Sequence, residues 1–253
     1  MTFVDLYDTN LDIELGSGQT QLFTVALRKS AVNAAMRDFV RKTGCTKKYD
    51  EIPLVDETQE YDVYDTLTDY IRLAGAPSVK WTDADSNIRY IQGAKDFPRR
   101  SKEELDRLEP GWRDADPGTP SAWYLTDDTG ELVVGLYPAP EVGAGETWVL
   151  IVPYVANPTT MVGDATEPFT VGGTVMDRLE PYHQALVHFA AAQLEPLRKN
   201  YTGVQYQMQL YTGYVAEYLR QDRQDGQDQI TLLRDYYAEG QRSARAKDHT
   251  RYP

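Results

Sequence analysis

The sequence contains three histidines, and two of them, His183 and His188, lie on one predicted helix. Histidine is a frequent metal ligand and general acid or base, so this pair is the first candidate for a zinc or catalytic site. Their spacing turns the side chains about 140° apart on an α-helix, which prevents them from binding one ion together. His249 follows far away in the tail. We therefore expect packed or solvated histidines, with no metal and no cofactor.

Residues 83–87 begin like a calcium-binding loop, with Asp83 and Asp85 at alternate positions. Such a loop has a glycine at its sixth position for a sharp turn and a bidentate glutamate at its twelfth. This chain has Ile88 and Ala94 at those positions. We therefore predict a polar turn that precedes a strand. Residues 114–116 offer fewer ligands and are also interpreted as a turn.

Three glutamates, Glu131, Glu141 and Glu146, lie near aromatic residues in the sequence. Two acids beside an aromatic groove can hydrolyse a glycosidic bond. The neighbouring aromatic residues are Trp123, Tyr137 and Trp148. Acidic residues are abundant throughout the chain, so chance also accounts for this proximity. A hydrolase that cleaves glycosidic bonds is therefore one hypothesis for the function.

The sequence lacks the other common catalytic patterns. It contains no phosphate-binding Gly-Lys-Ser/Thr loop, no nucleophile elbow and no dinucleotide fingerprint. The single cysteine, Cys45, has no histidine near it in sequence and is interpreted as a structural thiol. We predict that the protein is not an enzyme.

The C-terminal tail, residues 241–253, is basic, although the whole chain has a formal net charge of -13. Its charge is about +3, from four cations and Asp248. The cations are Arg242, Arg245, Lys247 and Arg251. Two interpretations stay open: a frayed, solvated terminus, or an arm that orders when it docks on an acidic partner or on phosphate.

The clearest element is a helix predicted over residues 21–43. One face carries Leu22, Val25, Val32, Met36 and Phe39, and a neighbouring face carries Leu27, Ala31 and Ala35. Thr20 can cap the start of this helix, and Gly44 can end it in a left-handed conformation. Two apolar faces imply two packing neighbours. Residues 1–19 are predicted to be extended.

Short strands are predicted between residues 49 and 158, at 60–64, 70–73, 88–91, 122–125, 131–137 and 147–155. Hairpin turns are expected at residues 127–130 and 138–145. A short helix over residues 101–108 interrupts the strands, because Ser101 and Glu104 fit a capping box.

Helical spacing returns after residue 173. Asp177 and Glu180 suggest a second capping box, and Pro196 must end or kink the helix that follows. A longer helix is predicted over residues 204–222, with a weaker helical segment at 227–239. The apolar seam of the longer helix is Val204, Met208, Tyr211, Val215 and Tyr218.

These patterns predict an α+β fold. A helical bundle of residues 20–48 and 172–240, in which the N-terminal helix packs with the C-terminal helices, carries a β-rich insertion at 49–171. The extended segment 1–19 and the basic arm 241–253 flank it. The chain has 18 Tyr against 6 Phe, a bias that suits partly hydrated contact surfaces. Its acidity disfavours DNA wrapping, and no apolar run suggests membrane association.

Several segments resemble the head-to-tail adaptor proteins of tailed bacteriophages. The opening of that family is similar to residues 26–31 (ALRKSA), 36–43 (MRDFVRKT), 52–54 (IPL) and 60–63 (EYDV). Residues 118–120 (GTP), 123–124 (WY), 136–140 (LYPAP) and 157–158 (NP) follow in the family order. The resemblance covers roughly residues 20–222 and consists of packing and turn patterns.

The resemblance implies a homo-oligomeric ring, usually of twelve copies, between the portal and the tail in the virion neck, after synthesis in the host cytoplasm. The implied partners are the portal protein, a tail nozzle or tail-completion protein, and packaged double-stranded DNA that passes through the lumen without sequence-specific binding. In this family the C-terminal arm reaches toward the portal, which makes Arg242, Arg245, Lys247 and Arg251 candidate portal contacts. The alternative hypothesis is a carbohydrate- or host-recognition module of a phage tail.

Overall fold

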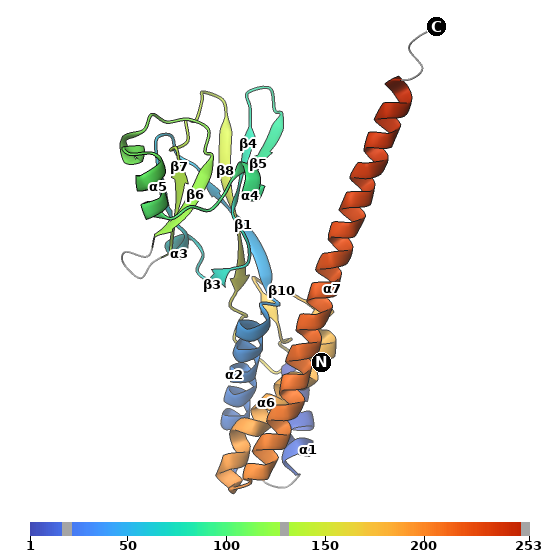
Figure 1. Cartoon of the computed structure of the whole chain (residues 1–253). Coiled ribbons are helices and arrows are strands. Elements are labelled where there is room, and N and C mark those ends of the chain that lie inside the picture. Colours follow the sequence, from blue (N-terminus) through green and yellow to red (C-terminus); the bar gives the residue numbers. More distant parts are fainter. Residues whose placement is uncertain (17–21, 127–131, 249–253) are drawn as a thin grey trace. The chain divides into compact units, whose positions relative to one another are not determined.

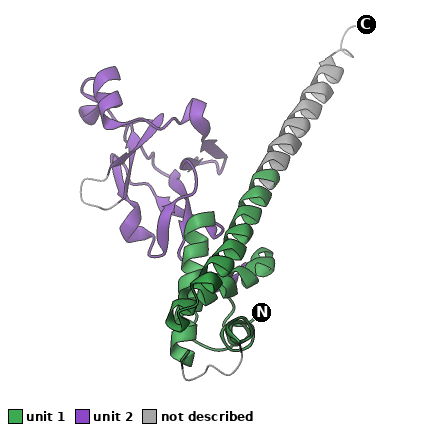
Figure 2. Cartoon of the chain, turned by 60° about the horizontal axis from the view of Figure 1, so that its bottom comes forward, with its two compact units in different colours: residues 1–43, 161–168, 178–253 green, residues 44–160, 169–177 purple. Residues whose placement is uncertain are grey.

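The computed structural model describes residues 1–16, 22–126 and 132–248, with side chains as far as residue 224 (Figure 1). The chain divides into two compact units (Figure 2). Unit 1 contains Met1–Thr43, Met161–Pro168 and Arg178–Pro253, and unit 2 contains Gly44–Thr160 and Phe169–Asp177. Helices account for 45% of the chain and strands for 23%, a mixture that is compatible with the predicted α+β class.

The N-terminal residues of unit 1 are helical. A π-helical segment, Asp5–Asn10, leads directly into α1 (Leu11–Leu15), so the prediction of an extended segment over residues 1–19 is wrong for this part. Phe3, Tyr7, Leu11 and Leu15 are buried and recur every fourth residue, which is helical spacing. Their alternation with acidic residues conceals this stripe in the sequence.

Arg28 of α2 (Val25–Thr43) fixes the N-terminal segment in place. Its side chain is 4% exposed, with Nη1 3.3 Å from Asp8 Oδ1 and 3.7 Å from Asp12 Oδ1. The same nitrogen donates a hydrogen bond to the carbonyl oxygen of Tyr7 at 3.0 Å. Burial of this cation is tolerated because carboxylates and a carbonyl replace its water.

α2 begins later than predicted and ends where predicted. It starts at Val25 after Thr24, whose hydroxyl accepts a bond from the Leu27 N–H at 3.3 Å. The predicted cap, Thr20, lies outside the described residues. Gly44 follows the last helical residue with φ of 65°, the left-handed conformation that the sequence predicted.

The C-terminal helices pack on α2 and on each other. A 3₁₀ segment, Asp177–Tyr182, precedes α6 (His183–Leu194), so the helix begins later than the predicted capping box at Asp177. A second 3₁₀ segment, Glu195–Arg198, contains Pro196 and separates α6 from α7 (Tyr201–Asp248), which confirms the predicted interruption. The two helices predicted at 204–222 and 227–239 are one continuous helix. A glycine such as Gly226 costs a helix about 1 kcal/mol and does not by itself end it.

An aromatic cluster forms the core where α2, α6 and α7 meet. The fully buried Phe39 ring lies 5.8 Å from Tyr182, 6.3 Å from Tyr211 and 6.0 Å from Tyr218, measured between ring centroids. Tyr211 and Tyr218 are buried members of the predicted seam of α7.

Unit 2 contains two main antiparallel sheets. In the larger one, the order is β1 (Lys47–Pro53), β8 (Thr147–Ala156), β4 (Ser78–Thr82) and β5 (Ile88–Ile91), and β3 (Tyr70–Leu73) also pairs with β8. The smaller sheet has the order β2 (Glu60–Asp62), β7 (Val133–Tyr137) and β6 (Ala122–Thr126). A separate hairpin joins β9 (Thr170–Val171) to β10 (Thr174–Val175). The short helices are α3 (Val63–Thr66), α4 (Gly93–Asp96) and α5 (Lys102–Leu108).

The two predicted hairpins have different outcomes. β6 and β7 pair as expected, with Thr126 opposite Val133, although the turn at 127–130 lies outside the described residues. The hairpin predicted across residues 138–145 is wrong, because β7 pairs with β2 and β6 while β8 belongs to the other sheet. A run of turn residues predicts where a chain changes direction, but it does not determine which strands then pair.

Residues from both sheets form the main core of unit 2, which includes Val79, Leu136 and Leu150. A second cluster lies beneath α5 and consists of Leu105, Trp112, Tyr124 and Tyr137. Ser101 caps α5 by accepting a hydrogen bond from the Glu104 N–H at 3.1 Å, which confirms the predicted cap. The short helix therefore covers one face of the smaller sheet.

Candidate functional site

The two histidines predicted to be packed or solvated are buried in unit 1. His188 Nδ1 lies 2.7 Å from Gln207 Oε1, and Gln207 Nε2 donates to Glu14 Oε2 at 2.8 Å. Since the amide oxygen of Gln207 can only accept, His188 Nδ1 carries the proton. This chain of hydrogen bonds joins α6, α7 and α1. Among the described residues no group of three His, Cys, Asp or Glu side chains is suited to a metal ion, and His249 lies outside them.

His183 makes the stability of unit 1 sensitive to mild acid. Burial lowers its pKa from 6.5 to about 4, so the unfolded chain takes up a proton before the folded one does. Its contribution to stability is therefore complete above about pH 6.5 and is lost as the pH falls toward 4. We expect thermal unfolding of a His183→Gln variant, followed by circular dichroism, to depend less on pH between these values than that of the wild type. Equal slopes would contradict this assignment.

The predicted polar turn before β5 is confirmed. The Asp83 carboxylate accepts hydrogen bonds from the Asp85 N–H at 3.1 Å and the Asn87 N–H at 2.8 Å, and from Asn87 Nδ2 at 3.0 Å. The bonds from Asn87 lower the pKa of Asp83. Its oxygens serve the turn, so the segment has the local geometry of an Asx turn.

Two of the three glutamates considered for sugar chemistry either serve another contact or lie outside the described range, and the third, Glu141, is exposed. Glu146 accepts a bond from Trp148 Nε1 at 2.9 Å, and Glu131 is outside the described residues. Trp112, Trp123 and Trp148 are between 3% and 5% exposed, so their faces cannot stack on a sugar. The predicted structural thiol, Cys45, is buried.

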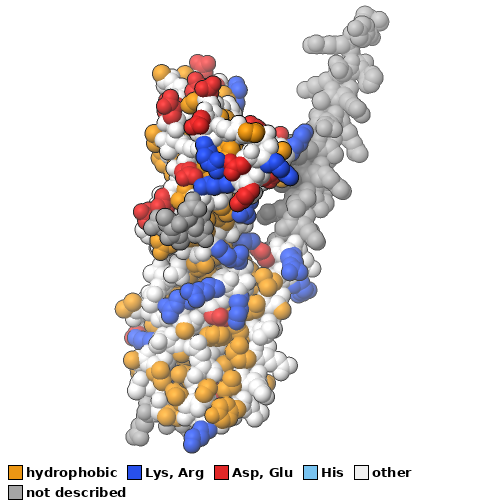
Figure 3. Space-filling view, turned by 60° about the vertical axis from the view of Figure 1, so that its left-hand side comes forward, with side chains coloured by type: hydrophobic (Ala, Val, Ile, Leu, Met, Phe, Trp, Pro, Cys, Tyr) orange, Lys and Arg blue, Asp and Glu red, His pale blue; other side chains and the backbone are white. Residues whose placement is uncertain are grey.

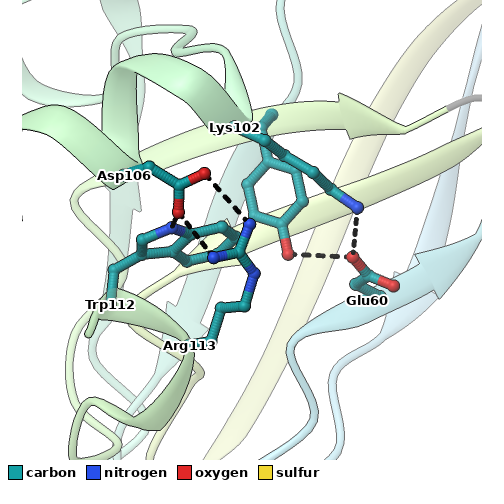
Figure 4. Close-up of polar contacts among 6 residues, drawn as sticks. Glu60, Lys102, Asp106, Trp112 and Arg113 are labelled. Carbon is teal, nitrogen blue, oxygen red and sulfur yellow. Dashed lines mark hydrogen bonds and ion pairs between the residues drawn. The ribbon is translucent and has the colours of Figure 1, made fainter. Parts of the chain in front are cut away.

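Two polar clusters hold α5 and the segment after it against the smaller sheet (Figure 4). Asp106 accepts hydrogen bonds from Trp112 Nε1 at 2.8 Å and from both terminal nitrogens of Arg113, at 2.5 and 3.2 Å. The bonds from Arg113 and then Trp112 lower the pKa of Asp106. Glu60 accepts a bond from the Tyr124 hydroxyl at 3.1 Å. Both carboxylates are occupied by these contacts, which suits a structural brace.

The second of these clusters also contains Lys102, whose Nζ lies 3.3 Å from Glu60 Oε1, and through Lys102 it borders a basic groove. One cavity of about 400 Å³ is lined by Arg99, Arg100, Lys102 and Glu103, together with Leu125 and Thr126. An adjoining cavity of about 490 Å³ shares Arg99, Leu125 and Thr126 and adds apolar residues. Those added residues are Tyr64, Tyr70, Ile71 and Leu132. We call the two cavities together the basic groove.

Unit 1 carries a different kind of exposed surface (Figure 3). Residues 201–216 of α7 include no charged residue, although 26% of the chain is charged. Tyr201 and Tyr206 are 67% and 58% exposed. The other exposed positions on this uncharged face of α7 are Thr202, Gln205, Gln209, Thr212, Gly213 and Ala216.

Exposed apolar residues also lie beyond the uncharged face, in the segment before α7 and in α1. Leu197 is 52% exposed and Ile13 of α1 is 68% exposed. The two segments are adjacent, because the Arg198 guanidinium donates a hydrogen bond to the carbonyl oxygen of Leu15. Apolar side chains clustered on a surface indicate contact with a partner.

The predicted basic arm is not tested by these observations. The side chains of Arg242, Arg245, Lys247 and Arg251 lie outside the described part of the chain. Among the helices that are described, none is long and apolar enough to cross a membrane. Sequence reasoning missed the basic groove, because its residues come from segments that only the fold brings together.

Comparison with known proteins identifies the family. The family model described as SU10 adaptor protein matches residues 1–234, and no curated protein matches the chain. This match includes the N-terminal helical segment, which the resemblance noted in the sequence left out. The chain therefore belongs to the SU10 adaptor protein family, a family of phage head-to-tail adaptors.

Proposed function

We propose that the protein is a non-enzymatic subunit of a ring in the phage neck, between the portal and the tail, through which the genome passes. The main observation that supports ring formation is the uncharged face of α7. Protein interfaces are depleted of charge at their centre and enriched in tyrosine, and this face has both properties. A closed ring also needs two different contact surfaces on each subunit.

The partners in this proposal are further copies of the chain, the portal protein, and a tail nozzle or tail-completion protein. Twelve copies are the number that the family resemblance suggests. Arg242, Arg245, Lys247 and Arg251 are the proposed portal contacts, because an arm with four cations complements an acidic surface. The net charge of -13 suits a lumen along which double-stranded DNA slides without sequence-specific binding.

A charge placed on the uncharged face of α7 is expected to prevent ring assembly. A Tyr206→Arg variant would bury an unpaired guanidinium between subunits, which costs several kcal/mol unless a partner is present. Negative-stain images of the wild type, alone and with its portal, should show rings, and those of the variant should not. Thermal unfolding of the variant should match the wild type, because Tyr206 is exposed.

A Tyr49→Arg variant provides the matched control. Tyr49 is 72% exposed and lies on β1 of unit 2, so it is not part of α7. The control should assemble as the wild type does. Normal rings from the Tyr206→Arg variant would exclude this face as a ring contact.

A further inference from the structure

The basic groove lies at one end of the smaller sheet of unit 2. Leu125 and Thr126 line it, and Thr126 pairs with Val133 at that end of β6 and β7. At the opposite end Ala122 pairs with Tyr137, and the chain continues into the loop of residues 138–146. With a rise of about 3.3 Å per residue, the two ends of β6 are about 13 Å apart.

The loops at this opposite end bring acidic residues together. Glu57 N–H donates to the carbonyl oxygen of Pro140 at 2.9 Å, and Val142 N–H donates to Asp56 Oδ1 at 2.7 Å. The turn between β4 and β5 is adjacent to the loop of residues 138–146, since a Cβ added at Gly145 would lie 3.7 Å from the Cβ of Ala84 in that turn. We call this surface the acidic rim, and it consists of Asp56, Glu57, Asp83, Asp85, Glu141 and Glu146.

Arg99 gives the basic groove an exposed positive charge. Its side chain is exposed, and its guanidinium carbon lies 5.6 Å from the centroid of the Trp123 ring. No carboxylate within the described ranges forms an ion pair with it. By contrast, Arg100 is paired with Glu104 at 2.9 Å. Arg99 is therefore the cation most accessible to an incoming acidic group.

We propose that the basic groove of one copy receives the acidic rim of the next copy, with Asp85 and Glu141 as the leading acidic contacts. This inference rests on the proposed ring. Cyclic assembly joins one surface of a subunit to a different surface of its neighbour, so the two surfaces must be complementary. Surfaces of opposite charge on one chain meet that requirement, and they also disfavour the wrong pairing of groove with groove.

A charge-swap experiment tests this contact. The groove variant is Arg99→Glu with Arg100→Glu, the rim variant is Asp85→Arg with Glu141→Arg, and the swap variant combines all four. Sedimentation velocity at about 50 mM and about 500 mM salt measures self-association with and without screening. We expect the groove and rim variants to associate about tenfold more weakly at low salt, and the swap variant to recover. Arg107→Glu with Lys95→Glu, two reversals elsewhere in unit 2, should leave association unchanged.

Each of the other outcomes contradicts a different part of the proposal. If the groove variant assembles normally while Tyr206→Arg does not, the ring stands and the groove contact is wrong. If the groove variant loses only binding to the portal or tail protein, the occupant is that protein and not a second copy. If the wild type stays monomeric with and without its portal, the ring and this contact both fail. Melting temperatures equal to that of the wild type would show that the variants lose the contact and not the fold. The single variant Arg99→Glu provides the same check with one substitution.

Discussion

A Gly135→Ala variant is expected to lose about 3 kcal/mol or more of the stability of unit 2. Gly135 lies in the central strand of the smaller sheet, directly opposite Tyr124. A Cβ at this position would lie 2.0 Å from Cζ of the Tyr124 ring, far inside van der Waals contact. The ring cannot move aside, because it is fully buried and packs edge-on against Trp112 at 5.2 Å. Overpacking of this kind typically costs about 1–3 kcal/mol and occasionally more, and the loss lies at or above the top of this range here because backbone and ring must both shift.

Intrinsic fluorescence measures this loss selectively, because all four tryptophans belong to unit 2. Urea unfolding of the Gly135→Ala variant should show a lower fluorescence midpoint than the wild type. A Gly213→Ala variant is the control: no atom lies within 4 Å of the added Cβ, and alanine favours a helix by about 1 kcal/mol over glycine. A fluorescence midpoint unchanged by Gly135→Ala would show that the Tyr124 ring does not cover this glycine.

Residue patterns within a segment predict those strands whose own sequence is typical of a β-strand. β3 and β5 begin and end at the predicted residues, and β6 and β8 differ by one residue at one end. β1 was not predicted, because Lys47, Lys48, Asp50 and Glu51 resemble an exposed loop and only Ile52 is buried. Its pairing with β8 is a long-range interaction, which residue patterns within the segment do not contain.

The candidate surfaces differ in how far the sequence reveals them. The absence of charge from residues 201–216 can be seen in the sequence, and helical spacing separates the buried positions from the exposed ones. The basic groove cannot be found that way, because Tyr64, Arg99 and Leu125 lie far apart in the chain. Only the pairing of strands and the cap of α5 bring them together. The predicted arm with Arg242 lies beyond the described side chains, so its docking stays a prediction.

The two units support different parts of the adaptor proposal. Unit 1 has an aromatic core and an exposed face without charge, which suits a contact held by apolar and tyrosine side chains. Unit 2 has its charge divided between groove and rim, which suits a contact that selects orientation. Testing assembly therefore requires variants whose effect on folding is known for each unit separately.

A Phe39→Ala variant is expected to lose about 3–5 kcal/mol of the stability of unit 1. Phe39 is fully buried, and its ring lies within 6.3 Å of Tyr182, Tyr211 and Tyr218, so its removal leaves a cavity at the meeting point of three helices. Proteins are stable by only about 5–15 kcal/mol, and this loss is a large part of that total. Circular dichroism at the helix band should show a lower unfolding midpoint, while tryptophan fluorescence from unit 2 should change less.

Two further variants separate the cavity from other effects of losing Phe39. Phe39→Leu keeps most of the apolar volume and should lose less than half as much stability, because the cavity is smaller. Tyr201→Ala removes an aromatic ring that is 67% exposed and should change stability by no more than about 0.5 kcal/mol. If Phe39→Ala unfolds at the wild-type midpoint in the helix signal, the aromatic cluster does not hold α2 against α6 and α7. An equal shift in both signals would instead mean that the two units unfold together.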